Sequence, residues 1–409
     1  MDYVSRPDYE QRLRKLRETE DIKVLTGVRR CGKSSLLHWL KSDLLSNGVE
    51  ECNIFYCRLD AFGAPVNPNA EWLQSEISQA ISNSNQSKCF YVLLDEIQDV
   101  QSWERIVRQL HTRPNTDVYI TGSNAYVLSS DLATLIGGRY VEVKVQPLSF
   151  AEYLSFAEAY GLSFDSKAAA FAEYLRYGGM PALFHLKERT VEELSQLLRT
   201  IYETVILNDV AARTKINDLD LLSKLVRYVF STSGSLFSTN KITNTLTSNG
   251  RKTRPETIDG YLRALTDALI LYECEQMGLA GKEILRPQRK FYPVDTGLRN
   301  LMRNFAPGDS GFQIENVVHN ELTRRGWKPT VGTLRAGEVD FVAEKAQERC
   351  YVQVSESIAD PSTYERELAP LNAIDDAWPK YVLTADYLNC GTTENGIQIV
   401  NIIDWLLAK

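Results

Sequence analysis

The chain has 409 residues, of which 44% are hydrophobic and 24% are charged, so roughly two to four domains with ordinary cores are expected and wholesale disorder is excluded. The formal net charge of −7 gives no global reason to expect nucleic acid as a partner, and no run of about 18 apolar residues predicts a membrane span. Neither the seven cysteines nor the four histidines have zinc-ligand spacing. The amino-terminal MDYVSRPDYEQ is unlike a signal peptide, and we expect a cytoplasmic protein with reduced thiols.

The first motif is GVRRCGKS at residues 27–34, which has the GxxxxGK[ST] spacing of a phosphate-binding loop. A short apolar strand at 22–26 precedes it, and leucines at helical spacing follow it up to Gly48. Glycines let successive N–H groups point at phosphates, and the start of a helix adds its positive end. The predicted nucleotide contacts are Gly27, Arg29, Arg30, Cys31, Gly32, Lys33, Ser34 and Ser35. The sequence therefore predicts binding of ATP or GTP with Mg²⁺.

The side chains that would carry the chemistry come from this loop and from a second strand. Lys33 is expected to reach the outer phosphates, and the Ser34 hydroxyl is expected to ligate Mg²⁺. Residues 90–96, FYVLLDE, form an apolar strand that ends in two acids, the Walker B pattern. Asp95 would hold the metal, and Glu96 would activate the attacking water as a general base. The acid pair favours hydrolysis over nucleotide storage.

Cys31 lies inside the loop, beside a helix start and three basic residues. These charges favour its thiolate, so one hypothesis is that Cys31 reacts more readily than the other thiols. The alternative is a small residue tolerated at a permissive position.

Three further strands, at 53–58, 117–121 and 140–145, are expected to complete a five-stranded parallel sheet with intervening helices. After residue 147 the apolar pattern is helical, with a break at GGMP, which suits a lid.

Segment 221–292 has the order helix, helix, turn, helix, hairpin, which is the plan of a winged helix-turn-helix. Residues 241–290 contain nine Lys or Arg and six Asp or Glu. The cations expected to contact phosphates are Arg251, Lys252 and Arg254 at the third helix, and Arg286, Arg289 and Lys290 on the wing. Three acids on the same helix (Glu256, Asp259 and Asp267) oppose DNA binding, and winged helices also dock proteins, so both partners stay open.

The last 100 residues have the layout of a PD-(D/E)xK nuclease. Glu315 lies on a predicted helix, and Glu338 and Asp340 lie on a predicted strand. The closing acid and lysine are replaced by Gln353 and Ser355, and strand alternation points Glu356 away from the site. We therefore expect a degenerate nuclease site, formed by Glu315, Glu338, Asp340 and Gln353, without nuclease activity.

The ordered motifs GVRRCGKS, LLDEIQD, ITGSN, GGRY and PLSFAEYL, followed by YGGMP, YPVDTGL, ENVVHNEL, GEVDF and ERELAPL, resemble those of the bacterial and archaeal AAA+-type P-loop ATPases whose second half is a domain of unknown function. The resemblance spans nearly the whole chain and implies an α/β fold in four parts. These are an AAA+-like P-loop core with a parallel sheet (1–146), a helical lid (147–220), a winged helix-turn-helix (221–300) and an inactive restriction-endonuclease-like α/β domain (301–409).

The resemblance also implies adenine rather than guanine, because no NKxD motif follows the strands. It suggests that Thr121, Ser123 or Asn124 orients water near the terminal phosphate, and that Arg139 reaches the nucleotide of a neighbouring subunit in a homo-oligomer.

Three functions follow from these features. The first is Mg²⁺-dependent ATP hydrolysis that moves the winged-helix and nuclease-like modules, on double-stranded DNA bound by residues 241–290 or on a partner protein. The alternatives are a slow nucleotide-gated protein- or DNA-binding switch and an active metal-dependent DNA nuclease, the last disfavoured by Gln353 and Ser355.

Overall fold

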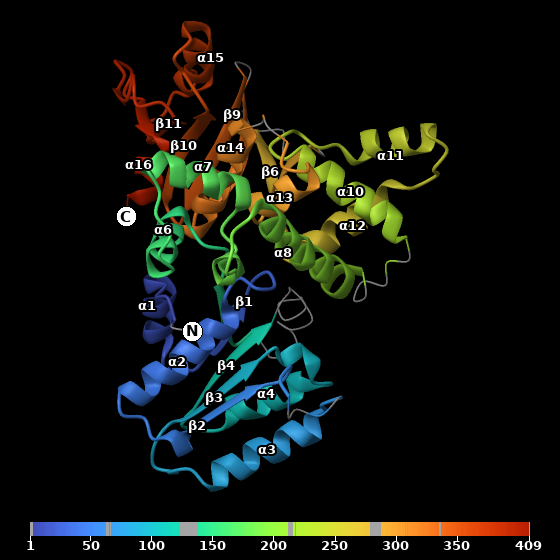
Figure 1. The fold of residues 1–409 in the computed structure, drawn as a ribbon, viewed down its shortest axis with the longest axis vertical. Coiled ribbons are helices and arrows are strands. Elements are labelled where there is room, and N and C mark those ends of the chain that lie inside the picture. The colour runs from blue at the N-terminus through green and yellow to red at the C-terminus, as the bar shows by residue number, and fades with distance from the viewer. Residues whose placement is uncertain are drawn as a thin grey trace. The chain divides into compact units, whose positions relative to one another are not determined.

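The computed structural model describes residues 3–62, 65, 67–122, 138–211, 216, 218–278, 288–306, 308, 310–334 and 337–408, with every side chain in these ranges except that of Asn208. The chain divides into two compact units, Met1–Gln146 with Asp267–Leu269, and Pro147–Thr266 with Ile270–Lys409. Each unit contains its own β-sheet (Figure 1). Within the described part of the chain, no helix combines the length and the apolar character needed to cross a bilayer.

The first unit is built on a five-stranded sheet in which every neighbouring pair is parallel. Its strands are β1 (Ile22–Thr26), β2 (Ile54–Arg58), β3 (Phe90–Asp95), β4 (Thr116–Gly122) and β5 (Tyr140–Lys144), in the spatial order β2-β3-β4-β1-β5. The predicted five-stranded parallel sheet is confirmed. Parallel strands end at one edge, so the loops after β1 and β3 lie on the same side of the sheet.

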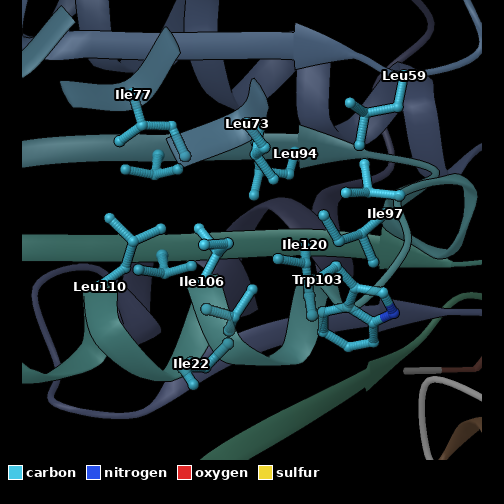
Figure 2. Packing of buried hydrophobic residues seen from close by; sticks show 14 of the residues in the cluster. Ile22, Leu59, Leu73, Ile77, Leu94, Ile97, Trp103, Ile106, Leu110 and Ile120 are labelled. Atoms are coloured by element: carbon cyan, nitrogen blue, oxygen red, sulfur yellow. The ribbon is translucent and has the colours of Figure 1, made fainter. Parts of the chain in front are cut away.

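Helices cover this sheet because its central strands are apolar on both faces. Every residue of β3 is buried. On one face, Leu73 and Ile77 of α3 (Ala70–Ser82) and Ile106 and Leu110 of α4 (Trp103–Thr112) pack against β3 and β4 (Figure 2). The other helices of this unit are α1 (Pro7–Leu16) and α2 (Lys33–Ser46), with short 3-10 turns at η1 (Glu51–Asn53) and η2 (Ile97–Asp99).

The second unit begins with helices, as the apolar pattern predicted. These are α6 (Phe150–Ala159), α7 (Lys167–Tyr177) and α8 (Val191–Thr204), with a 3-10 turn η4 (Pro181–His185) and a π-helical stretch η5 (Val205–Ala211).

The GGMP break after α7 fits against the later DTGL motif. Gly178 has φ 79°, and a Cβ there would lie 2.1 Å from Asp295 Oδ1. Asp295 accepts hydrogen bonds from Gly179 N (2.7 Å) and Leu298 N (3.1 Å), and so caps helix α13 (Thr296–Met302). The two motifs are therefore halves of one packed corner.

Three helices and a hairpin follow: α10 (Leu219–Ser231), α11 (Thr239–Ser248), α12 (Pro255–Asp267), β6 (Leu271–Gly278) and β7 (Arg289–Pro293). This is the predicted order of elements. Strand β6 also pairs in parallel with β8 (Lys328–Leu334), so the hairpin is continuous with the sheet of the chain's last part.

That sheet has eight strands in the order β12-β13-β11-β10-β9-β8-β6-β7. Its remaining strands are β9 (Gly337–Lys345), β10 (Glu348–Ser355), β11 (Lys380–Thr384), β12 (Gly391–Thr392) and β13 (Gln398–Asn401). The helices of this part of the chain are α14 (Ser310–Arg324), α15 (Pro361–Asn372) and α16 (Ile402–Leu407). One sheet therefore contains strands from both 221–300 and 301–409, the ranges expected to form a winged helix and a nuclease-like domain. The domain boundaries given from the sequence stay predictions.

Candidate functional site

The GVRRCGKS loop lies between β1 and α2, in the predicted order of strand, loop and helix. Gly27 (φ 150°) and Gly32 (φ 104°) both occupy backbone conformations that favour glycine. A Cβ on Gly27 would lie 2.1 Å from the Val145 carbonyl oxygen, so no larger residue fits there without moving backbone. Gly32 directly precedes the first turn of α2, whose unpaired N–H groups are available to an anion.

Lys33 is folded back on its own loop. Its side chain is buried, and its ammonium donates to the carbonyl oxygens of Gly27 (2.9 Å) and Val28 (3.4 Å). These partners are neutral, so the charge of Lys33 keeps its attraction for an anion placed over the loop.

Asp95 ends β3 as a fully buried carboxylate. Its Oδ1 accepts hydrogen bonds from Ser34 Oγ (3.0 Å) and Thr121 Oγ1 (2.5 Å). Its Oδ2 is buried without a hydrogen-bond partner, and the nearest cation to it is Arg58 Nε at 3.8 Å. Burial raises the pKa of Asp95, against the two hydroxyl donors. A hard divalent cation prefers such a carboxylate and a neighbouring hydroxyl, so these residues fit Mg²⁺.

Glu96 follows Asp95 in a left-handed conformation with φ 56°. Its backbone N–H donates to Thr121 Oγ1 (2.9 Å), and its carboxylate accepts a hydrogen bond from Gln98 Nε2. Thr121 therefore links the two acids, because its hydroxyl donates to Asp95 and accepts from Glu96.

The other predicted residues are placed less centrally. Arg30 and Ser35 are exposed on the loop and on the first turn of α2, and Arg29 is half-buried. Ser123 and Asn124 lie outside the described residues. Exposed Arg139 precedes β5, and its carbonyl accepts from Ile22 N at the start of β1 (3.1 Å). The phosphate loop follows the other end of that strand, so Arg139 does not join the loop within one chain.

The hypothesis of a reactive Cys31 is wrong. The side chain is fully buried, and its Sγ donates to the Val145 carbonyl oxygen (3.2 Å). Burial raises the pKa of this thiol and outweighs the nearby positive charges, of which Lys33 contributes most. Cys31 instead packs as a small residue beneath the loop.

Arg6, whose side chain donates a hydrogen bond to the backbone of the phosphate loop, was not identified from the sequence. Buried Arg6 donates from Nη1 to the Cys31 carbonyl and from Nη2 to the Gln146 carbonyl, both at 2.9 Å. Arg6 thus joins the loop to the segment after β5. No motif marks it, since its partners lie 25 and 140 residues away.

The four residues of the predicted degenerate nuclease site come together in the second unit. Glu315 from α14 and both Glu338 and Asp340 from β9 surround one ammonium, that of Lys290 on β7. Gln353 on β10 accepts from Asp340 N through Oε1 (3.2 Å) and donates to buried Glu367 (2.7 Å). No group of metal-ligating side chains with the arrangement of a metal site occurs among the described residues.

The prediction that Lys290 contacts DNA phosphates from a wing is wrong, because the side chain is buried. Arg251 is paired with Asp218 (2.6 Å) and Asp220 (2.5 Å), and Arg289 is paired with Glu273 (2.7 Å) and with Asp259. Lys252 and Arg254 are exposed, and Arg286 lies outside the described residues.

Comparison with known proteins agrees with this architecture. Residues 19–154 match the family model described as AAA domain, and residues 168–309 match one described as a domain of unknown function. An uncharacterized protein of Haemophilus influenzae is 37% identical over 408 residues, which is 99% of this chain and 98% of the relative. An uncharacterized protein of Methanocaldococcus jannaschii is 27% identical over 75% of this chain and 67% of its own length.

Among solved structures, the Walker-type ATPase of Pyrococcus abyssi is similar in fold, with a TM-score of 0.52 and 15% identity over 73% of this chain and 96% of that one. The chain belongs to the same protein family as the Haemophilus influenzae relative, and its residues 19–154 form an AAA domain with a P-loop ATPase fold.

Proposed function

We propose that this protein hydrolyses ATP in an Mg²⁺-dependent reaction at the loop between β1 and α2. The observation that carries the proposal is the buried Asp95 carboxylate, whose Oδ2 has no hydrogen-bond partner while Ser34 Oγ lies 3.0 Å from its Oδ1. A buried carboxylate oxygen left unpaired is costly unless a ligand satisfies it. The choice of adenine rests on the AAA domain match.

In this proposal the residues of the loop bind and orient the phosphates. The N–H groups at the start of α2 and the Lys33 ammonium bind phosphate oxygens, with Lys33 exchanging its carbonyl partners for them. Ser34 and Asp95 would hold Mg²⁺, and the bound ion would neutralise charge on the outer phosphates.

Glu96 is the general base of the proposed reaction. It follows the metal-holding acid, and Thr121 fixes its backbone through a hydrogen bond to the Glu96 N–H. Its carboxylate accepts a proton from the attacking water while the water oxygen bonds to the terminal phosphorus and the bond from that phosphorus to the bridging oxygen of ADP breaks. Thr121 is then a positioning residue, since it contacts both acids.

The test compares ATP hydrolysis by the intact chain with that of Lys33→Ala and Glu96→Gln. Glu96→Gln should bind ATP normally and lose about 100-fold or more in turnover, whereas Lys33→Ala should lose nucleotide binding. Glu76→Gln, at an exposed position of helix α3, is the matched control. Unchanged turnover in Glu96→Gln would remove Glu96 from the reaction, and GTP preferred over ATP in competition would overturn the choice of nucleotide.

A second candidate, a slow nucleotide-gated switch, is favoured by one contact. The Glu96 carboxylate accepts a hydrogen bond from Gln98, so one of its oxygens already has a partner within the fold. Tight ATP retention with negligible turnover supports the switch. Rapid turnover stimulated by a partner supports the ATPase.

For the rest of the chain we propose that hydrolysis moves the lid and the winged-helix and nuclease-like modules. The order α14-β8-β9-β10-α15-β11 supports a nuclease-like fold, and Gln353 with Ser355 supports its inactivity. Duplex DNA would bind through Lys252 and Arg254. Salt-insensitive or absent duplex binding by the intact chain removes that partner and leaves a protein partner.

We also propose that Arg139 acts on the nucleotide of a second copy in a homo-oligomer. Its exposure, away from the loop of its own chain, supports action in trans. The ATPase rate per subunit should then rise with protein concentration, and a rate independent of concentration contradicts the proposal.

A further inference from the structure

Lys290 is a lysine that the proposed ATPase does not use, and it is almost completely buried in the second unit. Its ammonium lies 2.6 Å from Glu338 Oε1, 3.0 Å from Glu315 Oε1 and 3.6 Å from Asp340 Oδ1. Glu338 and Asp340 are two residues apart on β9, so both project from the same face of the sheet. Glu315 comes from helix α14. One ammonium thus bridges a helix and two strands.

The neighbouring polar groups complete this cluster. Tyr292, on the same strand as Lys290, donates to Glu315 Oε1 (2.6 Å), and Val354 N donates to Asp340 Oδ2 (2.9 Å). Asp340 and Glu315 are buried, and Glu338 is about one-third exposed, with a side-chain exposure of 32%. Carboxylates taken out of water need a cation or several donors, and Lys290 serves all three.

Gln353 shows how the charge of the cluster is limited. In place of a fourth acid on β10, its amide accepts from Asp340 N and donates to Glu367, so it adds no charge. With one lysine against three acids, a neutral residue here keeps the buried excess of negative charge small. A neutral Gln353 therefore leaves fewer negative charges around Lys290 than an acid at this position would.

We propose that the Lys290 ammonium is the resident cation of the Glu315–Glu338–Asp340 cluster and occupies the position in which a divalent metal ion would neutralise the same carboxylates. The cluster is then a closed cation site that fastens the β6–β7 hairpin to α14 and β9. Ser355 stands where the PD-(D/E)xK pattern has a lysine, and Lys290 from another strand supplies an ammonium beside the acids instead.

The test is Mn²⁺ binding to the full chain, measured by electron paramagnetic resonance in an Asp95→Asn background that removes the metal ligand proposed at the nucleotide site. Adding Lys290→Met should create one Mn²⁺ site, at least about tenfold tighter than any in the background protein, and further adding Asp340→Asn should abolish it. Lys290→Arg is the charge-preserving control and should create none. Failure of a folded Lys290→Met variant to gain this site overturns the proposal.

A second arm does not depend on the folding of Lys290→Met. The background protein and its Asp340→Asn derivative should bind the same number of Mn²⁺ ions, because the native cluster is already filled. A Mn²⁺ site that Asp340→Asn removes from the background protein overturns the proposal and makes the cluster a metal centre beside Lys290. Neither arm uses ATP hydrolysis, so failure here is distinct from failure of the proposed ATPase.

Discussion

Two buried lysines, Lys33 and Lys290, differ in the groups that surround their ammonium ions. Lys33 bonds to neutral carbonyl oxygens of its own loop, while the nearby Asp95 keeps an oxygen without a hydrogen bond. The Lys290 ammonium lies within 3.6 Å of three carboxylates from two other elements. At the first site, the Lys33 ammonium and the Asp95 carboxylate can each still bind a ligand. At the second site, the lysine and the acids are already paired with one another within the fold. A buried lysine next to acids therefore indicates a ligand site only when the opposite charges are not already joined.

The largest expected effect comes from replacing each lysine by methionine. Lys290→Met leaves carboxylates buried without their cation and should lower the free energy of unfolding by about 3–5 kcal/mol. Lys33→Met removes hydrogen bonds to carbonyls together with a buried charge, so its loss should be about 1 kcal/mol. Chemical denaturation of both variants without nucleotide measures the difference. Equal losses in the free energy of unfolding would mean that the two lysines contribute equally to stability and would contradict the distinction.

The second prediction separates the acids in the same way. Asp95→Asn should reduce ATP turnover about 100-fold or more, with little change in stability, because burial already disfavours its charge. Asp117 is the matched control, since it is buried on β4 but paired with buried Lys23 at 2.5 Å. Asp117→Asn should cost about 3 kcal/mol of stability, with turnover retained by the folded protein. Turnover and thermal unfolding measured on both variants decide the matter, and destabilisation by Asp95→Asn would contradict the distinction.

The third prediction concerns pH and the second cluster. Burial, and next the charge of Glu315, raise the pKa of Asp340 to about 8. The folded chain therefore holds a proton that the unfolded chain releases near pH 4. This contribution to stability is fully present below about pH 4 and is lost as the pH rises through about 8, with a slope of at most about 1.4 kcal/mol per pH unit.

Thermal unfolding from about pH 5 to about pH 8 tests this slope. Asp340→Asn should flatten the pH profile, because the amide does not titrate. Asp165→Asn, on an exposed loop, should leave the profile unchanged. An identical slope in wild type and Asp340→Asn would assign the dependence to other groups.

Residues that lie close together in the sequence allowed much of both sites to be predicted, whereas contacts between residues far apart in the sequence were missed. The loop around Lys33 is recognised because eight consecutive residues carry its spacing and a strand and a helix flank it. Glu338 and Asp340 share a face because strand side chains alternate. The role of Lys290 was not predicted, because its partner Glu315 lies 25 residues further on and a local count of charges placed Lys290 on a surface wing. Arg6 was missed because its partners are fixed only by the folded backbone.

The smallest predicted effect concerns the hydrogen bond that Gln98 donates to the proposed general base, Glu96. Gln98 donates to the Glu96 carboxylate, so this acid, unlike Asp95 Oδ2, already has a partner within the fold. Gln98→Met keeps the side-chain length and removes the donor, and a hydrogen bond worth about 1 kcal/mol implies that kcat rises about fivefold while the KM for ATP is unchanged. Gln109→Met, exposed on α4, is the control. A lower kcat would show instead that Gln98 positions Glu96 for catalysis, and an unchanged kcat would show that this hydrogen bond does not affect the reaction.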